Sequence, residues 1–445
     1  MNEPLRYDDL DDEETGHPPL DASTDEFLNA ERPHEPAFAP EAGEEVDFAD
    51  RPVPRITIEA FCELEGTRRL IETCAHDRRF ARAHVEVLDH GLAGAIERYH
   101  DNPTPNLVVV ESGMRGRGLF EQLDELAGVC DPETKVVMIG AVNDIALYRE
   151  LIKRGISEYL VPPITPVQFM RTVSSLYTDP SAQFYGKTIA FVGAKGGSGS
   201  STIAHNTAWC VAETLGVDAT IVDLDLSFGT TALDFNQEVS SGVADALAQP
   251  ERVDDVLLDR LLTQCGERLS VFAAPAMIDR DYDFSPEACE TVIDALRRTV
   301  PMVILDMPHQ WVGWMRSSVY GADEVIITAT PDLASLRNAK HLYDTINATR
   351  PNDAAPKIVL NQVGLPKRPE IPVKDFAGAV GVEPSLVLPF DAAVFGAASN
   401  NGQMIPEMAA DSKVAEGFIN LAALLTGRDA PIRKRSFFER ALKRA

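Results

Sequence analysis

A glycine-rich stretch at residues 191–202, FVGAKGGSGSST, has the residue types and spacing of a phosphate-binding loop. It follows a strand-like apolar run at 187–192 and precedes a helix-like run at 203–211, which is the order that such loops require. Glycine lets backbone N–H groups approach phosphate oxygens closely, and the N-terminus of the following helix adds partial positive charge. The stretch therefore predicts a site for the phosphates of a nucleotide.

The loop departs from the common pattern G-x-x-x-x-G-K-[ST] at two positions. Ala194 replaces the first glycine and Ser200 replaces the lysine, although a lysine occurs earlier, at Lys195. A loop lysine neutralises charge that develops on the β and γ phosphates, and such electrostatic stabilisation can change a rate by orders of magnitude. Serine can donate a hydrogen bond but brings no charge. The loop therefore favours nucleotide binding with slow hydrolysis.

Aspartates end two later strand-like runs. Asp223 and Asp225 end the run IVDLD at 221–225, and Asp306 ends VILD at 303–306, which has the form of a Walker B segment. Carboxylates at the ends of parallel strands beside a phosphate loop can hold Mg²⁺ or orient an attacking water. Each aspartate alone is more often a helix cap or a turn residue. Their joint occurrence, in this order behind a glycine loop, predicts a Mg²⁺-nucleotide site.

Two segments alternate strand-like and helix-like runs, which predicts an α/β fold with largely parallel sheets. In the segment 55–178 we expect a flavodoxin-like domain, with strands at 56–62, 84–87, 107–110, 136–139 and 158–161, and helices at 66–74, 119–126 and 145–154. In the segment 187–427 we expect a P-loop domain with a mostly parallel sheet. Its strands are expected at 188–192, 219–222, 269–273, 302–305, 324–328, 357–360 and 385–388, and helices among others at 286–298 and 334–349. The residues between these segments, 177–187, are typical of a linker.

The first of these segments resembles a response-regulator receiver domain, on the runs PNLVVVESGM at 105–114 and GISEYLVPPI at 155–164. Glu111 stands where that family carries its phosphorylated aspartate, Gly140 where it carries a hydroxyl, and Pro162-Pro163 where it carries Lys-Pro. A glutamate cannot form the acyl phosphate in that geometry. The resemblance therefore implies a pseudo-receiver that serves interaction or localisation.

The charge of the chain is concentrated at its two ends. The formal net charge is −28, and residues 1–50 hold 17 acidic against 2 basic side chains, which gives −15. Residues 1–54 are acidic and proline-rich and predict a disordered tail. Residues 428–445 predict a basic amphipathic tail that can rest on an anionic membrane or bind an acidic partner, or is simply a solvated terminal helix.

Composition excludes several classes of protein. The acidic charge disfavours nucleic acid as a partner, because that binding depends on many Lys and Arg contacts to phosphates. The six cysteines form no C-x-x-C pair, which indicates reduced thiols. No apolar run approaches the roughly 18 residues that span a bilayer, and the N-terminus is acidic where a signal peptide is basic. We expect a cytoplasmic protein.

Four motifs together resemble the ParA/MinD branch of P-loop ATPases with a deviant Walker A loop: KGGSGSST at 195–202, DLD at 223–225, LDMP at 305–308 and VLNQV at 359–363. Four features resemble the CpaE/TadZ group more closely. They are the receiver-like segment in front of the glycine loop, and the motifs DLDLSFG at 223–229, LPFD at 388–391 and NNG at 400–402. That group is associated with Flp (Tad) pilus assembly and polar localisation. The resemblance covers residues 55–425.

The resemblance implies ATP and Mg²⁺ as cofactors and a homodimer that sandwiches the nucleotide. Lys195 would reach the partner's phosphates, Asp225 would orient the hydrolytic water, and Asn361 would contact adenine. The metal would be held by Ser201, Asp223 and Asp306. The phosphates would be wrapped by the loop residues Gly196, Gly197, Ser198, Gly199, Ser200, Ser201 and Thr202.

The function that the resemblance implies is that of an ATP-binding, slowly or non-hydrolysing protein that localises and helps assemble a Flp (Tad) type pilus or secretion machine. Its partners would be pilus or secretion proteins and polar landmark proteins, at the cell pole or peripheral to the inner membrane. Two alternatives remain: a nucleotide-independent pseudo-ATPase scaffold, and a MinD-like membrane-cycling or ParA-like positioning ATPase.

Overall fold

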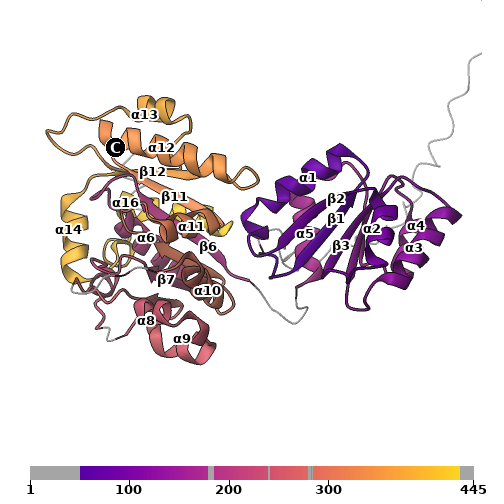
Figure 1. The fold of residues 1–445 in the computed structure, drawn as a ribbon. Helices are drawn as coiled ribbons and strands as arrows, with labels where there is room; N and C mark the ends of the chain where they lie inside the picture. The colour runs from indigo at the N-terminus through magenta and orange to yellow at the C-terminus, as the bar shows by residue number, and fades with distance from the viewer. Residues whose placement is uncertain (1–50, 179–184, 239–240, 279–281, 283, 431–445) are drawn as a thin grey trace, which may run out of the picture. The chain divides into compact units, whose positions relative to one another are not determined.

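The computed structural model describes residues 51–178, 185–238, 241–278, 282 and 284–430. The described chain contains two β-sheets flanked by helices, so the α/β class predicted from the sequence is confirmed (Figure 1). We call them the N-terminal sheet, within residues 57–160, and the C-terminal sheet, within residues 187–389. Three stretches lie outside the described residues: 1–50 of the tail expected at 1–54, 431–445 of the tail expected at 428–445, and 179–184 of the expected linker.

The N-terminal sheet has five parallel strands in the order β2-β1-β3-β4-β5, which confirms the predicted flavodoxin-like strand order. Its strands are β1 (Thr57–Cys62), β2 (His84–Asp89), β3 (Leu107–Ser112), β4 (Lys135–Gly140) and β5 (Glu158–Leu160). Its helices are α1 (Glu65–Ala75), α2 (Gly91–Tyr99), α3 (Arg117–Val129), α4 (Ile145–Lys153) and α5 (Pro166–Leu176).

The central strand β3 shows why this region folds as a sandwich of helices around a sheet. All its residues are buried, and successive side chains point to opposite faces. Leu107 and Val109 pack in one core with residues of α1 and α5, whereas Val108 and Val110 pack in another with residues of α2, α3 and α4. A continuous apolar run is therefore required, as in other sheets that are covered on both faces.

The C-terminal sheet has eight strands in the order β13-β12-β11-β6-β10-β7-β9-β8. All pairs are parallel except β8 with β9, so the prediction of a mostly parallel sheet is confirmed. The strands are β6 (Lys187–Gly193), β7 (Ala219–Asp223), β8 (Thr263–Gln264), β9 (Leu269–Phe272), β10 (Met302–Asp306), β11 (Glu324–Ala329), β12 (Lys357–Val363) and β13 (Leu386–Pro389).

Helices connect these strands and cover the sheet. They are α6 (Ser200–Trp209), α7 (Thr231–Asp234), α8 (Val243–Ala248), α9 (Asp255–Leu261), α10 (Pro286–Arg297), α11 (Gly313–Gly321), α12 (Leu333–Thr349), α13 (Val373–Val380), α14 (Ala392–Asn401), α15 (Ile405–Met408) and α16 (Lys413–Thr426). Val303 and Leu305 of β10 pack on one side with residues of α8 to α13. Met302 and Ile304 pack on the other with α6 and α16.

Two details differ from the sequence expectations. Packing begins earlier than the predicted tail boundary at 54, because Val53 is fully buried and its N–H donates to the carbonyl of Arg79 at 2.7 Å. The short antiparallel strand β8 and the helix α7 were not expected, since elements of two and four residues carry no periodic pattern. Within the described residues, no helix is long and apolar enough to cross a membrane.

Candidate nucleotide site

The glycine loop joins β6, in the middle of the C-terminal sheet, to the N-terminus of α6. Gly199 is the N-cap residue of α6 and has φ of 87°, and Gly197 has φ of 77°; both conformations favour glycine. A Cβ atom at position 199 would lie 2.5 Å from Nδ2 of Asn361. Glycine at 199 is therefore required both by the backbone conformation and by the close approach of a neighbouring side chain.

Three side-chain amides donate hydrogen bonds to backbone carbonyls of the glycine loop. Asn361 donates from Nδ2 to the carbonyl of Ser198 at 2.9 Å, and Gln362 donates from Nε2 to the carbonyl of Gly197 at 3.0 Å. Asn338 of α12 donates to the carbonyl of Ala194 at 2.8 Å. Because these amides satisfy loop carbonyls, they help to fix the shape of the loop. Asn361, expected from the sequence to contact adenine, is buried beneath the loop, and the adenine contact stays a prediction.

Lys195 forms an ion pair within its own chain. Its Nζ lies 2.6 Å from Oδ2 of Asp332, the N-cap residue of α12, whose Oδ1 accepts the N–H of Ser335. Burial alone raises the pKa of Asp332, but hydrogen bonds from Lys195 and Thr330 outweigh this and lower the pKa to about 2. The lysine predicted to reach a partner's phosphates is thus held by a neighbouring carboxylate in the single chain.

Ser201 and Asp306 meet at the ends of α6 and β10. The Ser201 hydroxyl donates to Oδ1 of Asp306 at 3.1 Å. Asp306 pairs in register with Asp223 on the neighbouring strand β7, so three residues expected to hold a metal lie at one edge of the sheet. They come together because the carboxyl ends of parallel strands meet at the same edge.

Asp223 has its carboxylate turned toward the segment that follows β7. It accepts hydrogen bonds from the N–H and hydroxyl of Thr231 at 3.2 and 2.7 Å and from the N–H of Asp225 at 3.1 Å. Burial, with a contribution from Asp306, raises its pKa to about 7. Asp225 lies in the turn, is half-buried and accepts the N–H of Phe228 at 3.1 Å; burial raises its pKa.

His205 is a residue of the site that the sequence analysis missed. It is fully buried on α6, with Nδ1 2.9 Å from Asp234 and Nε2 3.2 Å from Asp306. Burial lowers the pKa of His205, but the two carboxylates outweigh burial and raise the pKa to about 10. The sequence did contain a signal for His205: position 205 lies one helical turn after Ser201 and therefore on the same face of the helix.

The residues present fit a Mg²⁺-nucleotide group. Ser200 has a buried hydroxyl oxygen with no hydrogen-bond partner in the described structure, at the first position of α6. Among the described residues, no group of three His, Cys, Asp or Glu side chains could hold a metal by itself. Ser201 and Asp306 offer oxygen atoms, and Mg²⁺ usually binds one or two protein groups and completes its shell with water and substrate phosphates.

The receiver-like region places Glu111 in a different role from a phosphorylated residue. Its buried carboxylate accepts the N–H groups of Glu63 and Leu64 at 2.7 and 2.8 Å and the hydroxyl of Thr67 at 2.6 Å. Glu63 in turn accepts the N–H of Gly113 at 2.9 Å. The two carboxylates therefore tie the loops after β1 and β3 to each other.

The other two receiver positions are also altered. A Cβ atom at Gly140 would lie 2.7 Å from the Tyr159 hydroxyl, which donates to the carbonyl of Val142 at 2.9 Å. Tyr159 thus occupies the space beside Gly140, the residue to which the receiver resemblance assigns the hydroxyl position. The bond between Pro162 and Pro163 is cis. These contacts support the pseudo-receiver interpretation, which stays a prediction.

Replacing Glu111 with Gln is expected to speed hydrogen exchange at the amides of residues 63 and 64 by roughly 10- to 100-fold. The physical reason is that hydrogen bonds to a charged group contribute about 1.5–3 kcal/mol, and the Gln amide group would face buried donors. Exchange measured by NMR or mass spectrometry on the full chain tests this. Glu65→Gln, on the exposed side of α1, is the control and should change exchange less than about twofold. Unchanged exchange in Glu111→Gln would contradict the structural role of Glu111.

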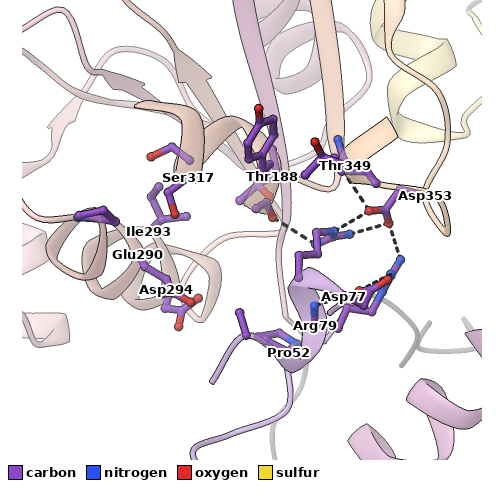
Figure 2. Close-up of a pocket in the computed structure, with 18 of the residues that line it drawn as sticks. Pro52, Asp77, Arg79, Thr188, Glu290, Ile293, Asp294, Ser317, Thr349 and Asp353 are labelled. Atoms are coloured by element: carbon purple, nitrogen blue, oxygen red, sulfur yellow. Dashed lines mark hydrogen bonds and ion pairs between the residues drawn. The ribbon is translucent and has the colours of Figure 1, made fainter. Parts of the chain in front are cut away.

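A pocket with a volume of about 270 Å³ lies at the opposite end of β6 from the glycine loop. Figure 2 shows Asp77, Arg79, Thr188 and Asp353 among the residues that line it. Its charges are paired, because Asp353 forms ion pairs with Arg79 and Arg350. We therefore assign this pocket to structural ion pairs and keep the glycine loop as the functional candidate.

Comparisons with known proteins show which proteins this chain resembles. A family model described as an AAA domain matches residues 186–358. The crystal structure of a pilus assembly protein CpaE from Caulobacter crescentus is 53% identical; the match covers 29% of this chain and 98% of that one, with a TM-score of 0.29. The structure of a putative CpaE2 pilus assembly protein from Sinorhizobium meliloti is 41% identical; the match covers 27% of this chain and 99% of that one, with a TM-score of 0.27.

The septum site-determining protein MinD of Synechocystis is 26% identical over 258 residues, which are 55% of this chain and 91% of that protein.

Proposed function

Because the chain belongs to the CpaE family of pilus assembly proteins, within the ParA/MinD ATPases, we propose that it binds ATP with Mg²⁺ and uses the nucleotide to control its own dimerisation during assembly of a Flp (Tad) type pilus. The observation that carries the proposal is the meeting of the glycine loop, Ser201 and Asp306 at one edge of the C-terminal sheet. The same edge holds Asp223 and Asp225.

Each group has a distinct part in this proposal. N–H groups of residues 196–202 bind the phosphates, and the N-terminus of α6 adds partial positive charge. Ser201 and Asp306 hold the metal, which when bound supplies charge neutralisation for the phosphates. Asp225 orients the water, and Lys195 leaves Asp332 to contact the phosphates bound by a second copy.

Hydrolysis is proposed to be slow because the loop lacks a charged group at position 200. The Ser200 hydroxyl can donate one hydrogen bond to a phosphate, and it is without a partner in the described structure. Preorganised charge at the transferring phosphoryl group is a large part of catalysis in P-loop enzymes. The bound nucleotide would then act mainly as a signal for monomer or dimer state.

Mass measurement with and without nucleotide tests the proposal. Light scattering after gel filtration should give about 48.6 kDa without nucleotide and about twice that value with ATP and Mg²⁺. EDTA should restore the monomer mass, and Asp306→Asn should prevent the change. A mass and a melting temperature that ignore ATP would instead support the second candidate, a pseudo-ATPase scaffold, which the missing charge at Ser200 favours.

The proposed places of action are the cytoplasm, the cell pole and the inner face of the membrane. The basic residues of the segment 432–445 motivate the membrane part, since clustered Lys and Arg are attracted to anionic lipids. Co-sedimentation with anionic vesicles, with and without this segment, tests it. Equal sedimentation of the two forms would contradict a membrane role for the tail.

A further inference from the structure

We propose that Arg368 is a positioning residue for the phosphates of the nucleotide, because it holds the side chain of Gln362 against the glycine loop. The inference rests on the proposed function, since it assumes that the glycine loop binds a nucleotide. It deepens that function by assigning a role to the loop of residues 364–370, which belongs to none of the motifs found in the sequence.

Strand β12 ends in a bulge that turns two neighbouring side chains toward the glycine loop. The register of β12 with β13 shifts between Leu360 and Val363, so that two residues, Asn361 and Gln362, stand opposite one residue of β13. In a regular strand, successive side chains point to opposite faces of the sheet. Here both side-chain amides donate to carbonyls of the glycine loop. The bulge is therefore what lets Gln362 reach the loop together with Asn361.

Gln362 has a backbone conformation that is unfavourable for its residue type. Its φ is 56°, in the left-handed region that glycine adopts more readily. Such conformations persist where the surrounding contacts over-determine them, and they cluster at functional sites. The N–H of Gln362 donates to Oδ1 of Asn361 at 2.8 Å, and its Nε2 donates to the carbonyl of Gly197 at 3.0 Å. The position of Gln362 therefore depends on bonds from neighbouring groups.

Arg368 supplies bonds to both acceptor atoms of Gln362. Its Nη1 donates to Oε1 of Gln362 at 3.3 Å, and its Nη2 donates to the backbone carbonyl of Gln362. Nη2 also lies 3.0 Å from Oε1 of Glu370, a carboxylate that accepts two backbone N–H groups of the same loop at 2.8 and 3.0 Å. A guanidinium group can only donate and a carbonyl can only accept. Arg368 and Gly197 therefore fix the orientation of the Gln362 amide between them.

The bond from Gln362 supports the turn that carries Lys195. In a planar trans peptide, the carbonyl and the following N–H point in opposite directions. Holding the carbonyl of Gly197 thus also directs the N–H of Ser198, which donates to the carbonyl of Lys195 at 3.3 Å and closes the turn of residues 195–198. Two of the glycines proposed to bind phosphates lie in this turn. Loss of the amide bond should therefore weaken phosphate binding although no group that touches the nucleotide is removed.

Binding of ATP with Mg²⁺ to the full chain, measured by calorimetry, tests the proposal in the wild type, Arg368→Ala, Gln362→Met and the double variant. Methionine has nearly the size of glutamine but donates no hydrogen bond. Each single change is expected to weaken binding by about three- to tenfold, the range of one ordinary hydrogen bond. The double variant should match Gln362→Met to within about twofold, because Arg368 acts through Gln362. Lys374→Ala, which removes an exposed cation of α13, is the control for lost charge and should change binding less than about twofold.

A double variant whose loss equals the product of the two single losses would overturn the proposal, since the two residues would then act independently. Wild-type affinity in Arg368→Ala would overturn it as well. Hydrogen exchange at the amide of Ser198, measured by NMR in the nucleotide-free chain, separates this inference from the proposed function. It should become about threefold faster or more in both single variants. A wild type that binds no ATP overturns the proposed function, and the exchange then decides alone whether Arg368 positions the loop. Unchanged exchange in both variants overturns the inference in either case.

Discussion

Ser200→Lys is expected to raise the rate of ATP hydrolysis by about 100-fold, because it adds a positive charge where the transferring phosphoryl group would lie. Removal of one preorganised electrostatic contact from an active site typically costs about 10²–10³ in rate, and the reverse substitution should recover a similar factor. The substitution breaks no hydrogen bond of the described structure, since Ser200 begins α6 and its hydroxyl has no partner there.

Steady-state release of phosphate measures this effect, with Ser200→Ala as the control. The alanine variant should not hydrolyse ATP faster than the wild type, because it adds no charge beside the phosphates. Adding Asp225→Ala to Ser200→Lys should remove the gain, since the water would lose the group that orients it. A wild-type enzyme that already turns over at about 1 s⁻¹ or faster, and that Ser200→Lys leaves unchanged, would contradict the proposed reason for slow hydrolysis.

Long apolar runs made most of the fold predictable. Strands β3 and β10 were expected to within two residues at each end, because buried parallel strands are continuous apolar segments bounded by polar residues. The order of the strands in the N-terminal sheet followed from five repeats of one strand and one helix. The two-residue strand β8 escaped prediction because it depends on its partner β9 and not on a pattern of its own.

The sequence predicted those parts of the candidate site that lie at strand ends. It did not predict contacts between side chains that are far apart in the sequence. Asp223 and Asp306 end neighbouring parallel strands, so their proximity was expected and is observed. The hydrogen bond between Lys195 and Asp332 joins residues 137 positions apart, and no local sequence pattern predicts it. The sequence analysis did not single out Asp332, which in the structure also caps the start of α12.

His205 escaped prediction for a related reason. A buried histidine on a helix is usually a core residue, and its meaning comes from Asp234 and Asp306, which reach it from two other elements. Glu111 shows the converse case. The sequence indicated that its phosphorylation chemistry was lost, but only the structure shows that the carboxylate instead binds the loop after β1.

Lys195→Ala is expected to weaken dimerisation in the presence of ATP and Mg²⁺ by about 100-fold or more. Truncating one member of a charge pair that is desolvated at an interface typically costs about 2–5 kcal/mol. Sedimentation equilibrium at several protein concentrations measures the dissociation constant. Lys340→Ala is the control, since this lysine of α12 forms an ordinary surface pair with Asp344 and its loss should leave the constant unchanged.

Asp332→Asn is expected to act in the opposite direction and to strengthen the dimer by about three- to fivefold. In the single chain Lys195 must leave Asp332 before it can reach a second copy, and a partly exposed ion pair of this kind holds it by about 0.5–1 kcal/mol. Asparagine retains the oxygen that caps α12, so the helix should keep its start. The same sedimentation assay reads both variants. A dimer that weakens in Asp332→Asn while the chain stays folded would show that Asp332 supports association directly and does not compete for Lys195.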